Sequence, residues 1–268
     1  MGGRVGAGMN KLICGNWKMH HDHLQAVSTL QALSLRLQAA NLSKVEVVVH
    51  PPFVDLRSCQ TVIEDRHIPV LLGAQNCHSE DSGAYTGEVS PAMLAKLAVS
   101  YVIVGHSERR RLFHESDADI AAKVPAVLRY GMTPIVCVGE DEQERDAGRT
   151  MERLESQASI SLSKVKKAGI PSVVFAYEPL WAIGSGNPAT IEDASIAREA
   201  VAGAVACASR GAAVEEGSGT RVLYGGSVVP DNAADFVKKG GMDGLLVGGA
   251  SLSPESFAAI VEAVAAVS

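Results

Sequence analysis

The chain has 268 residues and a mass of 28.0 kDa, enough for one large domain or two small ones with a sizeable buried core. Hydrophobic residues make up 47% and charged residues 20%, as in ordinary globular proteins. The formal net charge of -6 argues against a nucleic-acid-binding protein, which would carry a basic surface. No apolar run approaches the roughly 20 residues that span a bilayer.

Residues 1–10 lack the apolar segment of a secretory signal peptide, and we interpret them as a flexible leader before the folded domain. Cys14 and Cys137 lie in predicted strands and are expected to be buried packing residues. The number of cysteines is odd and none forms a Cys-x-x-Cys pair: Cys14, Cys59, Cys77, Cys137 and Cys207. This pattern favours reduced thiols and a cytoplasmic protein over disulfides or a thiolate metal site.

Eight short β-rich segments occur along the chain, and most are continuous apolar runs. Such runs are typical of parallel strands that are covered on both faces. The predicted strands cover residues 12–14, 45–49, 70–72, 101–104, 134–138, 173–177, 221–224 and 244–247.

Helices are predicted between these strands at residues 24–39, 117–130, 140–168, 190–210 and 254–267. Asp22 is expected to cap the first of them. Thr190 and Asp193 resemble a capping box, and Ser253 followed by proline marks the start of the last helix.

Eight strand–helix units in about 250 residues are typical of a (β/α)₈ barrel. A doubly wound open sheet also alternates strands and helices, and periodicity alone does not exclude it. No linker or low-complexity stretch interrupts the alternation, so a single α/β domain over residues 11–268 is favoured. In either architecture, ligands bind at the carboxyl ends of the strands.

Three reactive side chains follow predicted strands. Lys18 follows the first strand, His106 the fourth and Glu178 the sixth, so a barrel would direct all three to one mouth. Singly they could be a surface lysine, a helix cap and a solvated turn residue. Their coincidence at three strand ends favours an active site.

Glycine clusters follow the last three strands, at residues 184–186, 225–226 and 248–249. Glycine allows the backbone to approach a ligand closely, so that N–H groups can donate to phosphate oxygens. The loops after strands seven and eight are the usual phosphate site of a barrel. In a chain with 26 glycines, ordinary turns are the alternative for any single cluster.

From about Lys11 onward the sequence is similar to the triosephosphate isomerase family. The similarity is carried by GNWK at 15–18, GAQN at 73–76, GAYTGE at 83–88, VGHSERR at 104–110, CVGE at 137–140, AYEPLWAIG at 176–184, YGGSV at 224–228 and VGGA at 247–250. It implies a TIM barrel enzyme of glycolysis and gluconeogenesis that interconverts dihydroxyacetone phosphate and glyceraldehyde 3-phosphate through an enediol(ate). It implies no metal ion or organic cofactor.

The resemblance also implies a role for each site residue. Glu178 resembles the base, His106 the neutral electrophile, and Lys18 the cation that faces the substrate. The other implied substrate contacts are Asn16, Gly184, Ser227, Gly248 and Gly249, and the implied supporting residues are Glu108, as a partner of Lys18, and Ser107.

Two loops complete the expectations from the family. Residues 179–186 resemble a closing lid, and residues 85–88, from Tyr85 to Glu88, resemble a loop that inserts into a second subunit, which implies a homodimer. The lid departs from the usual Thr-Gly-Lys pattern, because it ends in Ser-Gly-Asn at 185–187 and is followed by Pro188. Pro188 biases the preceding residue away from helix, which bears on lid kinetics rather than on the chemistry.

Three other site chemistries are less favoured. Residues 105–109 nearly match the Gly-x-Ser-x-Gly motif of serine hydrolases, but Arg109 replaces the last glycine and only His114 follows Ser107. Residues 184–189 match a loose dinucleotide motif without the required acidic residue near position 205. The run His-His-Asp-His at 20–23 could suggest a metal site, but consecutive ligands rarely share one face, and we interpret it as a solvated helix start.

A barrel that binds sugar phosphates without catalysis is the alternative from a different functional class. It would keep the glycine loops and Lys18 but lose Glu178 or His106. Since both residues are present, catalysis is favoured.

Overall fold

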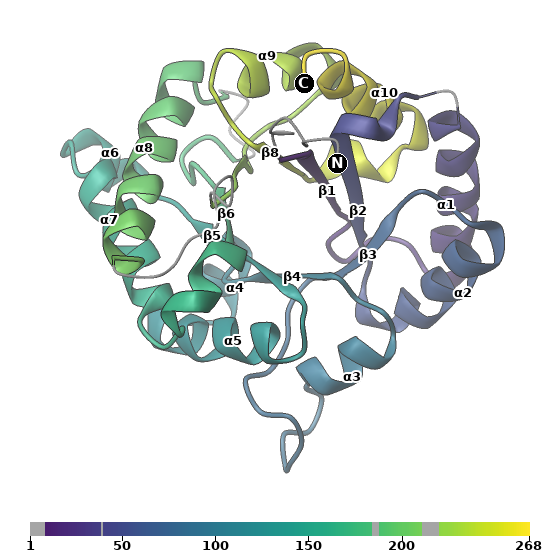
Figure 1. The fold of residues 1–268 in the computed structure, drawn as a ribbon, viewed down its shortest axis with the longest axis horizontal. Coiled ribbons are helices and arrows are strands. Elements are labelled where there is room, and N and C mark those ends of the chain that lie inside the picture. The colour runs from purple at the N-terminus through teal and green to yellow at the C-terminus, as the bar shows by residue number, and fades with distance from the viewer. Residues whose placement is uncertain (1–8, 39, 184–187, 211–219) are drawn as a thin grey trace, which may run out of the picture.

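The computed structural model describes residues 9–38, 40–183, 188–210 and 220–268. Eight parallel strands pair in sequence order and close into a barrel, because β1 pairs with both β2 and β8 (Figure 1). The strands are β1 (Lys11–Asn16), β2 (Val45–His50), β3 (Leu71–Ala74), β4 (Tyr101–Val104), β5 (Thr133–Val138), β6 (Val174–Tyr177), β7 (Val222–Tyr224) and β8 (Gly244–Val247). The predicted barrel is confirmed, and closure excludes the open sheet, which would have two unpaired edges.

The helices form a ring around the barrel (Figure 1). The α-helices are α1 (His23–Leu37), α2 (Leu56–Arg66), α3 (Pro91–Lys96), α4 (Ser107–Leu112), α5 (Asp117–Arg129), α6 (Glu142–Asp146), α7 (Thr150–Leu162), α8 (Ile191–Ala208), α9 (Pro230–Lys238) and α10 (Pro254–Ala265). Short 3-10 helices are η1 (Leu42–Lys44), η2 (Phe53–Asp55), η3 (Lys167–Ser172) and η4 (Gly249–Leu252). Within the described residues, none of the helices combines the length and the apolar run that crossing a bilayer needs.

The predicted helix starts are confirmed by side-chain caps. The Asp22 carboxylate accepts the N–H of Leu24 and Gln25, each at 2.9 Å. Thr190 and Asp193 form a reciprocal capping box, and the Ser253 hydroxyl accepts a backbone N–H at the start of α10. Each cap satisfies N–H groups that have no partner inside the helix.

The prediction of one helix over residues 140–168 is wrong. Asp141 caps α6, so the helix starts after it, and Glu140 is buried instead of lying on a helix. Gly148 then adopts a left-handed φ of 68°, which ends the first helix before α7 begins. Of the predicted leader over residues 1–10, the structure describes only Met9 and Asn10.

The barrel interior is filled largely by small and branched side chains. Alternate residues of the strands point inward, and this interior cluster consists of Leu12, Cys14, Val48, Tyr101, Ile103, Ile135, Cys137, Val174, Ala176, Leu223 and Leu246. A second, larger cluster packs the outer strand faces against the helices. Cys14 and Cys137 are buried as predicted, in agreement with an aliphatic core that needs few aromatics.

His50 is a fully buried histidine at the end of β2. It pairs in register with Asn16 of β1, and its ring covers Gly73 so closely that a side chain at position 73 would collide with it. Burial disfavours the charged imidazole and lowers the pKa of His50 to about 3. The ring therefore stays neutral at any pH at which the protein is ordinarily handled.

Replacing His50 with leucine should make the unfolding free energy less dependent on pH. Below about pH 6.5 an unfolded histidine binds a proton, whereas buried His50 stays neutral until about pH 3. Its contribution to stability is therefore complete above pH 6.5 and declines as the pH falls, by about 2 kcal/mol at about pH 5. Urea unfolding of both proteins at about pH 7.5 and about pH 5 measures this difference. If both proteins lost the same unfolding free energy between the two pH values, His50 would not be a buried neutral histidine with a lowered pKa.

Candidate active site

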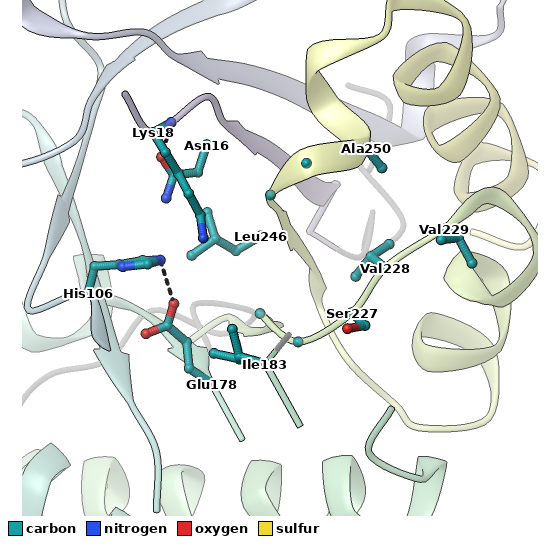
Figure 2. Close-up of a pocket in the computed structure, with 14 residues that line it drawn as sticks. Asn16, Lys18, His106, Glu178, Ile183, Ser227, Val228, Val229, Leu246 and Ala250 are labelled. Carbon is teal, nitrogen blue, oxygen red and sulfur yellow. Dashed lines mark hydrogen bonds and ion pairs between the residues drawn. The ribbon is translucent and has the colours of Figure 1, made fainter. Parts of the chain in front are cut away.

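The carboxyl ends of five strands surround a cavity of about 350 Å³ (Figure 2). Its walls come from the segments after β1, β4, β6, β7 and β8, and the volume suits a small ligand. Among the lining residues are seven predicted from the sequence: Asn16, Lys18, His106, Glu178, Ser227, Gly248 and Gly249. Predicted Gly184 and the lid residues 185–187 lie outside the described residues.

Contacts of its own backbone hold Glu178 in place in this cavity. Its N–H donates to the Val138 carbonyl at 2.8 Å, and a side chain on Gly139 would lie 1.8 Å from the Glu178 carbonyl oxygen. Glycine is therefore required at position 139. The carboxylate is 2% exposed and accepts the N–H of Ser107 at 2.8 Å.

His106 precedes α4 and faces the same carboxylate. Its Nδ1 accepts the N–H of Glu108 at 3.2 Å, which leaves the proton of the neutral ring on Nε2. Nε2 lies 2.9 Å from Oε1 of Glu178, and Figure 2 shows the two side chains pointing toward one another. The ring thus caps α4, which was the alternative to a catalytic role, and it also presents an N–H donor to the cavity.

The two groups perturb one another. Burial alone would raise the pKa of Glu178, but His106 and the N–H of Ser107 hold that pKa below its ordinary value. Burial would lower the pKa of His106, yet the carboxylates of Glu178 and Glu108 outweigh it and raise the pKa. Without the Glu178 carboxylate, its share of this upward effect on the His106 pKa would be lost, whereas that of Glu108 would remain.

Lys18 projects from the loop after β1. The loop is shaped by a left-handed φ of 53° at Lys18 and by the Asn16 amide oxygen, which accepts the Lys18 N–H at 3.0 Å. The ammonium group donates to Glu108 Oε1 at 2.7 Å, the contact expected between them. Figure 2 shows the lysine reaching over the cavity toward His106.

Gln75 is a supporting residue for which the sequence suggested no role. Its side-chain amide donates to the carbonyl of Lys18 at 2.7 Å and to that of His50 at 2.9 Å. It therefore ties the lysine loop to the end of β2. Its place after β3, inside the GAQN string, was the available signal.

The opposite wall of the cavity is formed mainly by backbone. Gly225, Gly226 and Ser227 follow β7, and Gly248 and Gly249 follow β8. A side chain on Gly225 would meet the Glu178 side chain at 3.1 Å. Since η4 starts at Gly249, the first N–H groups of that turn have no partner within it, and they can serve an anionic ligand.

Comparison with known proteins agrees with this arrangement. Residues 11–264 match the family model described as Triosephosphate isomerase. The chain belongs to the triosephosphate isomerase family. Triosephosphate isomerase of Corynebacterium glutamicum is 46% identical over 96% of this chain and 98% of its own length. That of Corynebacterium efficiens is 47% identical over 92% of this chain and 93% of its own.

A solved structure extends the agreement to the fold. The crystal structure of triosephosphate isomerase from Bartonella henselae superposes with a TM-score of 0.82 and is 34% identical in sequence. The match covers 95% of this chain and 99% of the other.

Membership in the triosephosphate isomerase family favours an isomerase over the rival interpretations. The backbone of Ser107 binds the Glu178 carboxylate, and His106 Nε2 faces that same carboxylate, so a serine–histidine pair is not formed. Much of the loose dinucleotide motif lies outside the described residues. In the described part of the chain, no group of three or more His, Cys, Asp or Glu side chains is arranged to hold a metal ion, and Asp22 caps α1. Since Glu178 and His106 are both present and in contact, the non-catalytic alternative is not supported.

Proposed function

We propose that the protein is a triosephosphate isomerase, which interconverts dihydroxyacetone phosphate and D-glyceraldehyde 3-phosphate. The observation that carries the proposal is the contact of a buried carboxylate with an imidazole beside a lysine, in one cavity with glycine-lined walls. Isomerisation needs a base, a donor to the developing oxyanion and a site for the phosphate. This cavity offers one candidate for each.

Glu178 acts as the base. Its lowered pKa keeps the carboxylate ionised at neutral pH, and exclusion of water makes an ionised carboxylate a stronger base. It takes a proton from C1 of dihydroxyacetone phosphate, and the electrons of that C–H bond pass to the carbonyl oxygen to form the enediolate. A proton then passes from the hydroxyl on C1 to the oxygen on C2. The same carboxyl group returns its proton to C2, which yields the aldehyde.

His106 and Lys18 stabilise the negative charge on oxygen. The Nε2–H of His106 donates to the enediolate oxygen, and the ammonium group of Lys18 adds a positive charge at the rim. Asn16 and Glu108 hold the lysine in place, and Ser107 holds the resting carboxylate. Ser227, Gly248 and Gly249, together with Gly184, bind the phosphate.

A coupled assay on glyceraldehyde 3-phosphate tests this proposal. The purified protein should form dihydroxyacetone phosphate, whose reduction by a coupling dehydrogenase consumes a measurable nicotinamide cofactor. Glu178→Ala, purified in the same way, is the control for contaminating isomerase. Equal rates for the two proteins would reject the proposed function.

We also propose that the protein forms a homodimer through the loop from Tyr85 to Glu88. This connection between β3 and α3 projects from the ring of helices (Figure 1), and Tyr85 is partly exposed. A groove of about 280 Å³ beside Lys18 includes Met19 and Phe113, which are 93% and 65% exposed. Apolar side chains that are this exposed and lie in one groove favour a protein partner. A second copy of the chain would offer its loop from Tyr85 to Glu88 as the segment that enters the groove.

Replacing Tyr85 with aspartate should weaken that dimer. The substitution removes the aromatic ring that would pack on apolar side chains of the groove such as Met19 and Phe113, so the dissociation constant should rise on the order of 10- to 100-fold. Sedimentation velocity should show wild type at twice the 28.0 kDa chain mass and the variant shifted toward the monomer. Leu35→Asp, on the outer face of α1, is the matched control. A wild-type monomer, or a dimer that Tyr85→Asp leaves intact, would reject the interface.

The remaining proposals concern the setting of the enzyme. We infer a single catalytic domain over residues 11–268, preceded by the leader. A cytoplasmic location is supported by the free thiols, four of which are buried.

A further inference from the structure

The first residues after Glu178 are anchored by a buried hydrogen-bond cluster. The indole N–H of Trp181 donates to Glu140 Oε1 at 2.8 Å, and the hydroxyl of Tyr177 donates to the same oxygen at 3.0 Å. The N–H of Leu180 adds a bond to the Glu140 carbonyl. Glu140 itself is 1% exposed. The segment that carries the base is therefore held from both sides of Glu178.

An arginine from another element covers the same indole. The guanidinium of Arg145, in α6, lies 3.6 Å from the centroid of the Trp181 ring. Its Nη2 lies 3.9 Å from Oδ1 of Asp193, which belongs to the capping box that starts α8. Arg145 thus contacts both the segment that follows Glu178 and the first turn of α8.

This arrangement is the resting position of the base. The Glu178 carboxylate is hydrogen-bonded to the Ser107 N–H and to His106 Nε2, which is the donor that the enediolate requires. The carboxylate must leave both groups before it can face a substrate carbon. Trp181 is only three residues along the chain, so contacts that hold its indole oppose this movement.

We propose that Arg145 is a positioning residue whose stacking on Trp181 stabilises the resting arrangement of residues 178–181 and thereby weakens the apparent affinity for triose phosphates. The proposal rests on the proposed function. If a ligand binds only to a different arrangement of these residues, its apparent dissociation constant rises as the resting arrangement becomes more populated. A cation stacked on tryptophan at a partly exposed site accounts for about a two- to fivefold population change.

Arg145→Met tests the proposal, because methionine retains much of the side-chain length but removes the charge and the planar stack. The probe is 2-phosphoglycolate, whose carboxylate and phosphate mimic the enediolate and its phosphate. Its dissociation constant is measured by intrinsic fluorescence, since the only tryptophans are Trp181 and fully buried Trp17. We expect the constant to fall about two- to fivefold, and the KM for glyceraldehyde 3-phosphate to fall with it.

Arg149→Met is the matched control, because this exposed arginine makes no ion pair or ring contact within the described part of the chain. It should leave the dissociation constant and the KM unchanged. Arg145→Lys keeps the cation but loses the planar stack, so its dissociation constant should lie between those of wild type and Arg145→Met. A loss of stability alone would not tighten binding. A dissociation constant that is unchanged or raised in Arg145→Met, with an active wild type, overturns the role of Arg145 alone. A wild type without isomerase activity overturns the proposed function as well.

Discussion

Replacing Glu178 with aspartate should lower kcat on the order of 10²-fold. The shorter side chain withdraws the carboxylate by about 1 Å from the carbon-bound proton, and misplacement on that scale is enough for such a loss. The backbone of residue 178 stays where it is, because it is bonded to Val138 and packed on Gly139. Steady-state kinetics in both directions measure the effect.

A second variant separates basicity from packing. Glu178→Gln keeps the size of the side chain but cannot accept the proton, so its kcat should be lower than that of Glu178→Asp. Thermal unfolding of both variants shows whether the barrel is intact. A near-normal kcat in Glu178→Asp would remove Glu178 from the role of base.

Replacing His106 with glutamine should lower kcat by about 10²- to 10⁴-fold, the range associated with a positioned proton donor or acceptor. Glutamine offers a side-chain N–H, but it cannot at once accept the Glu108 N–H in the geometry of the imidazole and aim a donor at the cavity. The donor is therefore no longer oriented toward the oxyanion.

The control for this prediction is His23→Gln, a change of the same kind at an exposed position at the start of α1. That variant should keep the wild-type kcat. If His106→Gln also kept it, the imidazole would not be the electrophile, and Lys18 alone would have to stabilise the enediolate oxygen.

The fold could be predicted because each strand is a local signal. Continuous apolar runs such as the one in β4 are long enough to identify a strand, and counting them indicates a barrel. The candidate site residues followed from the same count, because Lys18, His106 and Glu178 each come within two residues of the end of a strand. All three lie at carboxyl ends of strands, which the barrel gathers at one mouth, and the strand pattern of the sequence shows where those ends are.

The contacts within the site could not be predicted in this way. Ser107 and Glu178 are 71 residues apart, and only closure of the barrel brings the N–H of one to the carboxylate of the other. Gln75 donates to two backbone carbonyls, and because every residue has a carbonyl, the sequence does not show which ones it will bind. The error over residues 140–168 has a local cause, because a polar, helix-favouring composition continues across the break at Gly148.

The resting hydrogen bonds of Glu178 make the carboxylate an internal competitor of the substrate. A ligand that occupies only the glycine-lined wall, as inorganic phosphate would, leaves the carboxylate on Ser107 and His106. A ligand that also places a carbonyl oxygen at Nε2 displaces it and frees the base to face the adjacent carbon. With the proposed roles of these residues, the carboxylate is released only by ligands that carry the reacting carbonyl as well as the phosphate.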